Sequence, residues 1–297
     1  MIDTPTDPSL EALETAAATA GLDTRGATVI RRAENDLWRL PGGIVARIAR
    51  PGQDEAARRE VQVTRWLAKH VFPAVRPLTL EQPVTAHGRP VTFWEELPPH
   101  RPGTHSEIAQ LLRHLHALPV PGHLRLGRVD PFVRLQQRIT GAHGLTDEDR
   151  DWLLCRHDEL HAAWTQLPTG LPECVAHGDA WPGNVAVADD GTAYLLDFER
   201  SAIGPPEWDL TSTANSRDTT GRLSAEDYTS YCEAYGHDVT TWDGYPTLLA
   251  IRELRQTTMA IQLASKDPEH YADQARYRLD CLRGLHGHRP WSWTPVP

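Results

Sequence analysis

A hairpin signal in the second half of the chain constrains the fold most. Two short apolar segments, Val185–Ala188 and Ala193–Leu196, flank the dipeptide Asp190-Gly191, which favours a tight turn between antiparallel strands. With that dipeptide as the turn, paired positions have residue numbers that add up to 381, so Asn184 is opposite Asp197. Directly opposed residues have Cβ atoms about 5 Å apart. The pattern predicts an amide and a carboxylate side by side at the open end of the hairpin.

The same stretch supplies the groups that phosphoryl transfer needs. Asp179 precedes Asn184 across a Trp-Pro-Gly loop and is placed to accept a proton from a hydroxyl. Mg²⁺ takes one or two protein oxygens and fills its remaining positions with phosphate and water, so Asn184 and Asp197 are candidate metal ligands. A carboxylate base beside a metal-holding pair is the minimal apparatus for moving a phosphoryl group.

Three motifs in this region resemble one known family. They are H-G-D-x-x-x-x-N at His177–Asn184, L-D-F at Leu196–Phe198 and G-x-x-x-W-D-L at Gly204–Leu210. In this order they resemble the active-site signature of the aminoglycoside phosphotransferase and choline kinase family, the small-molecule relatives of protein kinases. The resemblance covers about residues 27–215 and is tightest in 175–210.

The resemblance implies a role for each motif residue. Asp179 would orient or deprotonate the acceptor hydroxyl, and His177 would brace the catalytic loop. Asn184 and Asp197 would hold Mg²⁺, with ATP or GTP as the phosphate donor. Asp209 would support the catalytic loop rather than touch substrate.

Two charged residues of the N-terminal part resemble the family more loosely. Alternation along Ile44–Ala49 places Arg47 where the family has a basic residue on the nucleotide phosphates, since neither lysine of the chain lies in an expected strand. Arg50 is a rival for this role. Glu60, in the following helix, fits the acidic partner of that base. The alternatives are an Arg47 that faces solvent on an edge strand and a Glu60 that makes an ordinary helix-surface pair.

The segment Phe93–Leu97 occupies the position of the family's hinge, so Glu95 and Leu97 are expected to offer backbone groups to a purine. Protein kinases cover the phosphates with a glycine-rich loop. The corresponding loop here, Arg32–Asp36, has no glycine, so its cover over the phosphates must differ.

The pattern of elements predicts an α+β, two-lobed, protein-kinase-like fold. A small N-terminal lobe with an antiparallel sheet is expected from helical and strand-like segments, at residues 8–20, 27–31, 36–40, 43–49, 54–69 and 90–95. A larger, mostly helical lobe follows, in which Thr104 and Glu107 form a capping box before an apolar stripe. We place the nucleotide-binding lobe at residues 1–97 and the catalytic and acceptor-binding lobe at 98–297.

Composition narrows the partners and the compartment. A net charge of −10 argues against nucleic acid as the main partner. The four scattered cysteines are typical of reduced thiols, and the polar N-terminus does not suit a secretory signal. No run of eighteen apolar residues occurs. We therefore expect a cytoplasmic protein that makes no membrane contact and is a monomer or a weak dimer.

The predicted function is transfer of the γ-phosphate of ATP or GTP to a hydroxyl of a small molecule, such as an aminoglycoside-like antibiotic, a sugar or an amino alcohol. A non-catalytic nucleotide-binding pseudokinase is one alternative. A metal-dependent phosphohydrolase is another, although no histidine-rich motif of that class occurs.

The acceptor is expected to be polyhydroxylated and cationic, because residues 98–297 carry nine of the ten net negative charges. Six acidic residues were candidates to line an acidic cleft: Glu207, Asp218, Glu226, Asp227, Glu233 and Glu253. The alternative is that these side chains are solvated faces of helices.

Four other residues have simpler interpretations. His114 and His116 share a helix, where histidines of the core or surface are more common than metal ligands. Trp291 and Trp293 are expected to pack the C-terminal segment onto the body, with stacking on substrate as the alternative.

Overall fold

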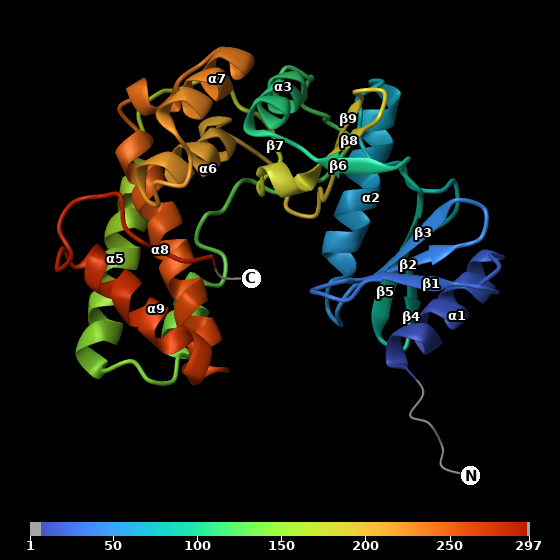
Figure 1. Cartoon of the computed structure of the whole chain (residues 1–297), viewed down its shortest axis with the longest axis horizontal. Coiled ribbons are helices and arrows are strands. Elements are labelled where there is room, and N and C mark those ends of the chain that lie inside the picture. Colours follow the sequence, from blue (N-terminus) through green and yellow to red (C-terminus); the bar gives the residue numbers. More distant parts are fainter. Residues whose placement is uncertain (1–6, 296–297) are drawn as a thin grey trace, which may run out of the picture. The chain divides into compact units, whose positions relative to one another are not determined.

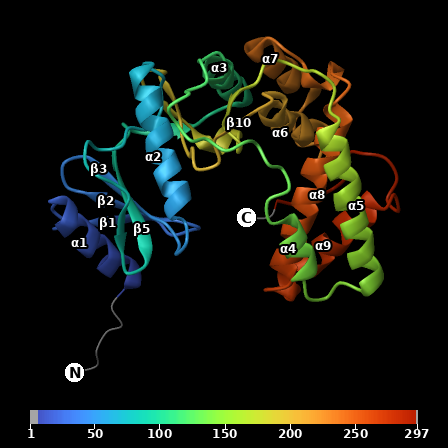
Figure 2. The same ribbon diagram turned by 180° about the vertical axis from the view of Figure 1, so that it is seen from behind.

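The computed structural model describes residues 7–295, and these form two compact units. The first unit comprises the described residues up to Gly127 together with His177–Ala202, and the second comprises Arg128–Ala176 together with the described residues from Ile203 onward. The first contains an antiparallel sheet and the second is mostly helical (Figures 1 and 2). The predicted α+β class is confirmed.

The first unit is built on a five-stranded antiparallel sheet of order β1-β2-β3-β5-β4. Its strands are β1 (Thr28–Arg31), β2 (Asp36–Leu40), β3 (Ile44–Ile48), β4 (Val84–Ala86) and β5 (Arg89–Glu95). The strand β3 is central, because it pairs with both β2 and β5. Arg47 therefore does not lie on an edge strand, which excludes one of the alternatives for this residue.

Two helices accompany this sheet. The helix α1 (Pro8–Ala20) begins at Asp7, whose side chain accepts a hydrogen bond from the backbone N–H of Ser9, and it packs its small apolar residues against Ala46 and Ile48 of β3. Successive side chains of a strand point to opposite faces, so Arg47 points to the other face. The helix α2 (Asp54–Lys69) lies beside β5 and supplies Glu60 (Figure 1).

A second, three-stranded sheet of order β6-β8-β9 carries the predicted hairpin. It comprises β6 (His100–Pro102), β8 (Val185–Ala188) and β9 (Ala193–Leu195), and the helix α3 (His105–His116) lies beside it. The predicted capping box at Thr104 and Glu107 begins α3.

The predicted register of the hairpin is wrong by one residue. Val185 pairs with Leu195 and Val187 with Ala193, so paired numbers add up to 380 and Asn184 is opposite Leu196. The reason is that the turn has three residues rather than two. The backbone N–H of Ala188 donates a hydrogen bond to the carbonyl of Thr192 across the turn, and Gly191 has a φ of 84°. A three-residue loop of this kind ends with a residue in the left-handed region.

The second unit contains six α-helices and a short two-stranded sheet among the residues that the structure describes. The strands are β7 (Cys174–Ala176) and β10 (Ala202–Gly204), and β10 begins at the boundary between the units. The helices are α4 (Leu135–Thr140), α5 (Asp147–Thr165), α6 (Glu207–Asp218), α7 (Ala225–Tyr235), α8 (Tyr245–Ala264) and α9 (Pro268–Leu282). A single apolar core joins α4, α5, α8 and α9, with Trp208 of α6 in it.

The C-terminal segment packs onto this helical unit. Trp291 and Trp293 are buried with Cys281 of α9, and the backbone N–H of Trp291 donates a 2.7 Å hydrogen bond to the carbonyl of Thr219. The prediction that these tryptophans fix the tail to the body is confirmed.

Candidate active site

The segment His177–Asn184 forms a loop whose path depends on Gly178. This glycine has a φ of 85°, and a Cβ there would lie 2.5 Å from the carbonyl oxygen of Arg200, so no other residue fits. His177 is fully buried, its Nε2 lies 2.8 Å from the carbonyl oxygen of Leu196, and its ring contacts Phe198 edge to face. His177 thus joins the loop His177–Asn184 to the segment that carries Asp197.

The amide of Asn184 is fixed within the same loop. Its Nδ2 donates a 2.9 Å hydrogen bond to the carbonyl oxygen of Asp179. Its Oδ1 therefore faces away from that bond, and it has no hydrogen-bond partner among residues 7–295. An amide oxygen that is fixed and unpaired is a suitable ligand for a hard cation.

The carboxylate of Asp179 remains accessible to a substrate. Its side chain is 40% exposed, and its Oδ1 lies 3.8 Å from Nη1 of Arg200. The backbone N–H of Asp179 donates to Nδ1 of His177 at 3.3 Å. The loop is therefore anchored through its backbone, while the carboxylate is free to meet a hydroxyl group.

Asp197 has a backbone φ of 62°, which is unusual for a residue other than glycine. The ladder of the hairpin ends just before it, with the backbone N–H of Leu196 donating to the carbonyl of Asn184 at 2.9 Å. One third of the Asp197 side chain is exposed. Backbone strain of this kind often accompanies functional positions, and here it turns the carboxylate out of the strand.

Asn184 and Asp197 together fit a Mg²⁺ ion by donor type, since both offer hard oxygen ligands. Within residues 7–295 no group of three or more His, Cys, Asp or Glu side chains is placed to hold a metal. The protein would therefore supply two ligands and leave the other positions to phosphate oxygens and water. The ring of His114 packs against Phe72.

Arg47 is surrounded by three carboxylates. Its guanidinium pairs with Glu60, donates a 2.7 Å hydrogen bond to Glu199, and lies 3.4 Å from Asp197. Burial works to lower the pKa of Arg47, but the charges of Glu60, Asp197 and Glu199 outweigh it and raise that pKa. The guanidinium is therefore a permanent cation beside the candidate metal ligand.

Glu60 is almost completely buried and is the partner of Arg47 in this structure. Burial, reinforced by the negative charges of Asp197 and Glu199, raises the pKa of Glu60 to about 7, against the opposing effect of Arg47. Burial and the neighbouring Asp197 also raise the pKa of Glu199. This network excludes the interpretation of Glu60 as an ordinary pair on a helix surface.

Arg50, the rival of Arg47, pairs instead with Glu34 of the loop between β1 and β2, and both side chains are more than half exposed. The same loop brings Asn35 to Arg47: with its amide oxygen toward the guanidinium, it accepts hydrogen bonds of 2.6 and 3.1 Å. This loop, which has no glycine, therefore contacts Arg47, the candidate phosphate-binding residue, through the side-chain amide of Asn35.

Of the predicted hinge residues, Glu95 is the last residue of β5 and Leu97 lies two positions beyond it. The backbone N–H of Glu95 donates to the carbonyl of Arg76 at 2.8 Å, so it is not available to a purine. The backbone N–H of Leu97 has no partner in the part of the chain that the structure describes. Of the two predicted hinge positions, Leu97 is the one with a free donor.

Three residues near the site were missed by the sequence analysis. Glu199 and Arg200 directly follow the L-D-F motif, and they contact Arg47 and Asp179. Trp181 lies in the catalytic loop and is 54% exposed, with its ring over Gly183, where a Cβ would lie 2.1 Å from the ring. The signal was present as two charged residues directly after a motif and an aromatic residue within one.

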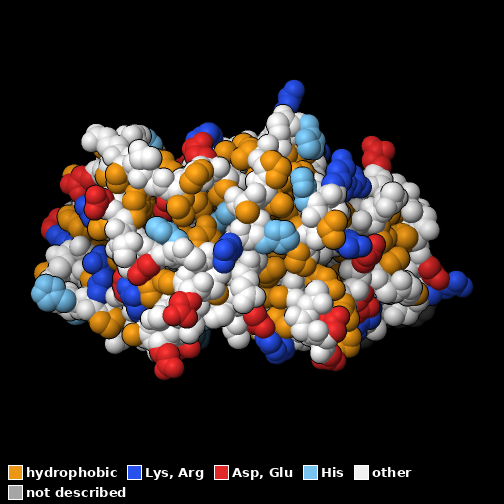
Figure 3. All heavy atoms as spheres, turned by 90° about the horizontal axis from the view of Figure 1, so that it is seen from above, with side chains coloured by type: hydrophobic (Ala, Val, Ile, Leu, Met, Phe, Trp, Pro, Cys, Tyr) orange, Lys and Arg blue, Asp and Glu red, His pale blue; other side chains and the backbone are white. Residues whose placement is uncertain are grey.

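Six acidic residues were expected to line an acidic cleft, and two of them, Glu207 and Glu253, do not support that expectation. Glu207 and Glu253 are buried and structural: Glu207 accepts from the backbone N–H of Leu171, and Glu253 accepts from Thr219 and Arg289. The face shown in Figure 3 has acidic and basic side chains interspersed. The uneven charge of the sequence therefore does not by itself define a cation-binding cleft.

Comparisons with solved structures agree with this fold. A choline/ethanolamine kinase family protein from Mesorhizobium loti is 19% identical, with a TM-score of 0.65 over 92% of this chain and 94% of that one. An amicoumacin kinase in complex with AMP-PNP and Ca²⁺ is 15% identical, with a TM-score of 0.67 over 93% and 94%. A spectinomycin phosphotransferase in complex with ADP is 14% identical, with a TM-score of 0.62 over 95% and 94%. No curated protein matches the chain in sequence.

These neighbours share a protein-kinase-like fold, which confirms the predicted fold class. The model of the phosphotransferase enzyme family matches residues 27–251. The chain belongs to the phosphotransferase enzyme family, and the predicted small-molecule phosphotransferase is confirmed at that level. No helix among the described residues is long and apolar enough to cross a membrane.

Proposed function

We propose that this protein transfers the γ-phosphate of ATP or GTP to a hydroxyl group of a small molecule, with Asp179 as the base. The observation that supports this most is the anchored loop: His177 and Asn184 fix its backbone, and the Asp179 carboxylate stays exposed. A base that is exposed and already held in position can accept a proton from a hydroxyl group without a rearrangement of its loop.

In the proposed reaction the acceptor oxygen bonds to the γ-phosphorus as the bond to the β–γ bridging oxygen breaks. The hydroxyl proton passes to Asp179, and the nucleoside diphosphate leaves. Arg47, held by Glu60, would bind the nucleotide phosphates as a preorganised cation. His177 would keep the loop and the Asp197 segment in register.

Asn184 and Asp197 would hold Mg²⁺, which when bound neutralises charge on the transferred phosphoryl group. Related structures contain ADP, or AMP-PNP with Ca²⁺, which supports the use of a nucleotide with a divalent cation. Leu97 would bind the purine through its free N–H, and Glu95 through its carbonyl group.

The acceptor remains a small hydroxylated molecule in this proposal: an antibiotic of the aminoglycoside type, a sugar or an amino alcohol. The names of the related kinases, for choline or ethanolamine, spectinomycin and amicoumacin, support that range. We further propose a cytoplasmic monomer or weak dimer, with nucleotide binding by residues 1–97 and acceptor binding by residues 98–297.

An acceptor screen for nucleoside diphosphate release, with ATP and GTP each as donor, tests the function. The proposal predicts release only when a hydroxylated acceptor is added, together with a phosphorylated acceptor of matching amount. Release of inorganic phosphate without acceptor would indicate a phosphohydrolase instead. Nucleotide binding with no release for any acceptor would indicate a pseudokinase.

A further inference from the structure

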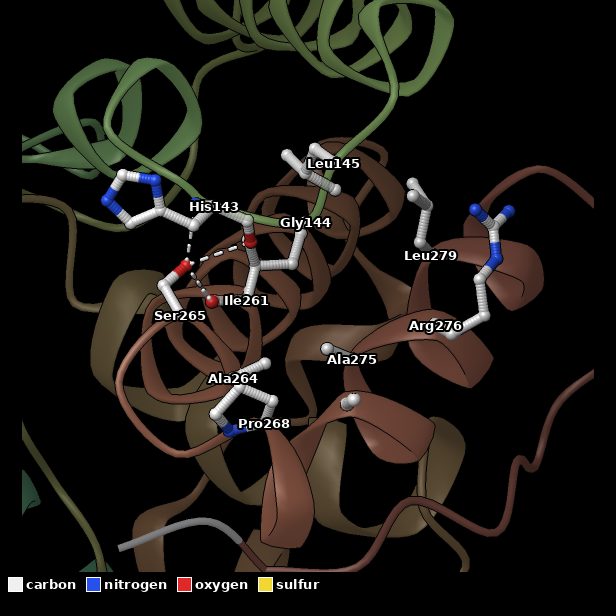
Figure 4. Close-up of a pocket in the computed structure, with 11 residues that line it drawn as sticks. His143, Gly144, Leu145, Ile261, Ala264, Ser265, Pro268, Ala275, Arg276 and Leu279 are labelled. Atoms are coloured by element: carbon white, nitrogen blue, oxygen red, sulfur yellow. Dashed lines mark hydrogen bonds between the residues drawn. The ribbon is translucent and has the colours of Figure 1, made fainter.

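Two of the hollows in the described part of the helical unit are lined by none of the residues that we propose for phosphoryl transfer. The smaller, of about 210 Å³, lies between α8, α9 and the loop before α5 (Figure 4). Its lining is mostly apolar, and its polar groups are already paired: Ser265 bonds to the backbone of His143, and Arg276 to Asp149 and Asp280. The hydroxyl of Ser265 and the guanidinium of Arg276 are therefore already occupied in this hollow.

The larger hollow has a different lining. It measures about 600 Å³, within the range of sites that hold small molecules, about 300–1,000 Å³. It is lined by Arg156 of α5, Arg217 and Asp218 of α6, the start of α8 from Tyr245, and Arg289 in the C-terminal segment. The helix α8 contacts both α5 and α6 in this unit (Figures 1 and 2). We call it the arginine cavity.

Each arginine of the cavity is fixed by a carboxylate and keeps free donors. Arg217 uses Nε and Nη2 to hold Asp218, at 2.5 and 3.1 Å, and stacks on Tyr228. Its Nη1 has no hydrogen-bond partner among residues 7–295. A guanidinium that is held on one edge and free on the other is prepared to bind an anionic oxygen.

Arg289 is arranged in the same way on the opposite element. Its Nε and Nη2 hold both oxygens of the buried Glu253, at 2.5 and 2.6 Å, and its Nη1 has no partner in the described part of the chain. Arg156 donates only from Nη1, in a hydrogen bond of 3.0 Å to the carboxylate of Glu159. Three separate elements therefore contribute guanidinium groups with unused N–H donors to the lining of the cavity.

Asp218 and the apolar residues define the rest of the ligand. Asp218 accepts a 2.6 Å hydrogen bond from the hydroxyl of Tyr245 and is the one carboxylate among the lining residues described. It offers an acceptor for a ligand hydroxyl. Pro246, Leu249 and Pro290 supply an apolar wall on which a carbon ring can lie.

We propose that the arginine cavity binds a small hydroxylated organic acid, whose carboxylate or phosphate group pairs with Arg217, Arg289 and Arg156. Binding at this cavity goes beyond the proposed phosphoryl transfer. The charged residues that line the cavity are three arginines and one aspartate.

Isothermal titration with four probes on one carbon skeleton tests the charge of the ligand. Glucuronate and glucose 6-phosphate carry the anionic group, glucose is neutral and glucosamine is cationic. No nucleotide is added, so the result does not depend on the proposed reaction. At least one of the two anions should bind at least about tenfold more tightly than glucose, and glucosamine more weakly than glucose.

Variants locate the binding. Arg217→Gln and Arg156→Gln should each weaken binding of the anion about tenfold or more, while Arg128→Gln, at an exposed arginine of the same unit outside the cavity, should not. Arg156 makes a single exposed ion pair, so its variant tests the site even where Arg217→Gln fails to fold. Arg47→Gln should leave the affinity for the anion unchanged. That result would show that the anion does not bind at Arg47, the candidate phosphate-binding residue of the other unit.

Three results would overturn the proposal. One is glucosamine binding as tightly as the anions. Another is affinity for the anions that is equal in wild type and in both cavity variants. The third is no measurable binding of either anion at millimolar concentration.

Discussion

The guanidinium of Arg47 donates a 2.7 Å hydrogen bond to the carboxylate of Glu199, so the central strand of the sheet is tied to the segment that follows Asp197. The same guanidinium is held by Glu60 from α2. A cation fixed by two carboxylates from different elements keeps its position when nucleotide arrives, and this is the basis of the first prediction.

Arg47→Ala should raise the KM for nucleotide about tenfold or more, because a hydrogen bond to a charged group is worth about 1.5–3 kcal/mol. The KM for the acceptor should change little. Steady-state kinetics with each substrate varied in turn measures both. Arg50→Ala is the matched control, since Arg50 is exposed and pairs with Glu34. A larger effect from Arg50→Ala would move the phosphate contact to that residue.

The buried Glu60 should make stability depend on pH. Its pKa is raised from 4.5 to about 7, so the folded protein favours the protonated form. That stabilisation is complete below the unfolded value and is lost as the pH rises through about 7. The free energy of unfolding of wild type, relative to Glu60→Gln, should fall between about pH 5 and pH 8.

Urea unfolding of the metal-free and nucleotide-free protein, at several pH values in this range, checks the Glu60 prediction. The difference between the two proteins is the quantity to follow, because other groups titrate in both. A difference that stays constant or grows with pH is incompatible with a raised pKa at Glu60.

The two candidate metal ligands should differ in importance. Asp197→Ala should abolish the Mg²⁺-dependent part of nucleotide affinity, whereas Asn184→Ala should reduce it less, because a carboxylate brings a full charge to the cation. Calorimetry of ATP binding with and without Mg²⁺ measures that part. Equal Mg·ATP affinity in wild type and Asp197→Ala would remove Asp197 from the metal site.

Trp181 is expected to contact the acceptor. An exposed indole two residues after the base offers an apolar surface, so Trp181→Ala should raise the acceptor KM severalfold while the nucleotide KM stays the same. Trp181→Phe, which keeps an aromatic face, should recover most of the loss. If Trp181→Ala alters neither KM, this ring does not line the acceptor site.

The elements of the first unit follow closely from the sequence because their signals are local. The helix at 54–69 and the strand at 36–40 have the predicted bounds, set by strong periodicity and by the turn at Pro41–Gly43. The helix at 8–20 ends as predicted at Gly21, which has a φ of 70°. Caps, turns and periodicity act over a few residues, which is why sequence alone specifies them.

The register of the hairpin shows where such reasoning fails. Asp190-Gly191 favours a two-residue turn, but Asp189 also enters the loop, and one added residue changes every pair in the hairpin. The contacts of Arg47 with Glu199 depend on residues that are 152 positions apart. Packing between distant segments decides such contacts, and no local pattern encodes them.

The expected acidic cleft loses two of its six acids in the folded chain for a related reason. Composition counts Glu207 and Glu253 with the surface acids, whereas the structure buries both and gives each a structural partner. A buried and paired carboxylate adds little to the field outside the protein. Only the folded chain separates acids that face a ligand from those that support a helix.

The most direct test of the central claim is the turnover of Asp179→Asn. With an acceptor identified by the screen, its kcat should fall by about 10²–10⁴ relative to wild type, while nucleotide affinity and the unfolding midpoint stay close to normal. Asp190→Asn, in the exposed hairpin loop, should retain full activity. Turnover of Asp179→Asn within a few-fold of wild type would contradict the assignment of Asp179 as the base.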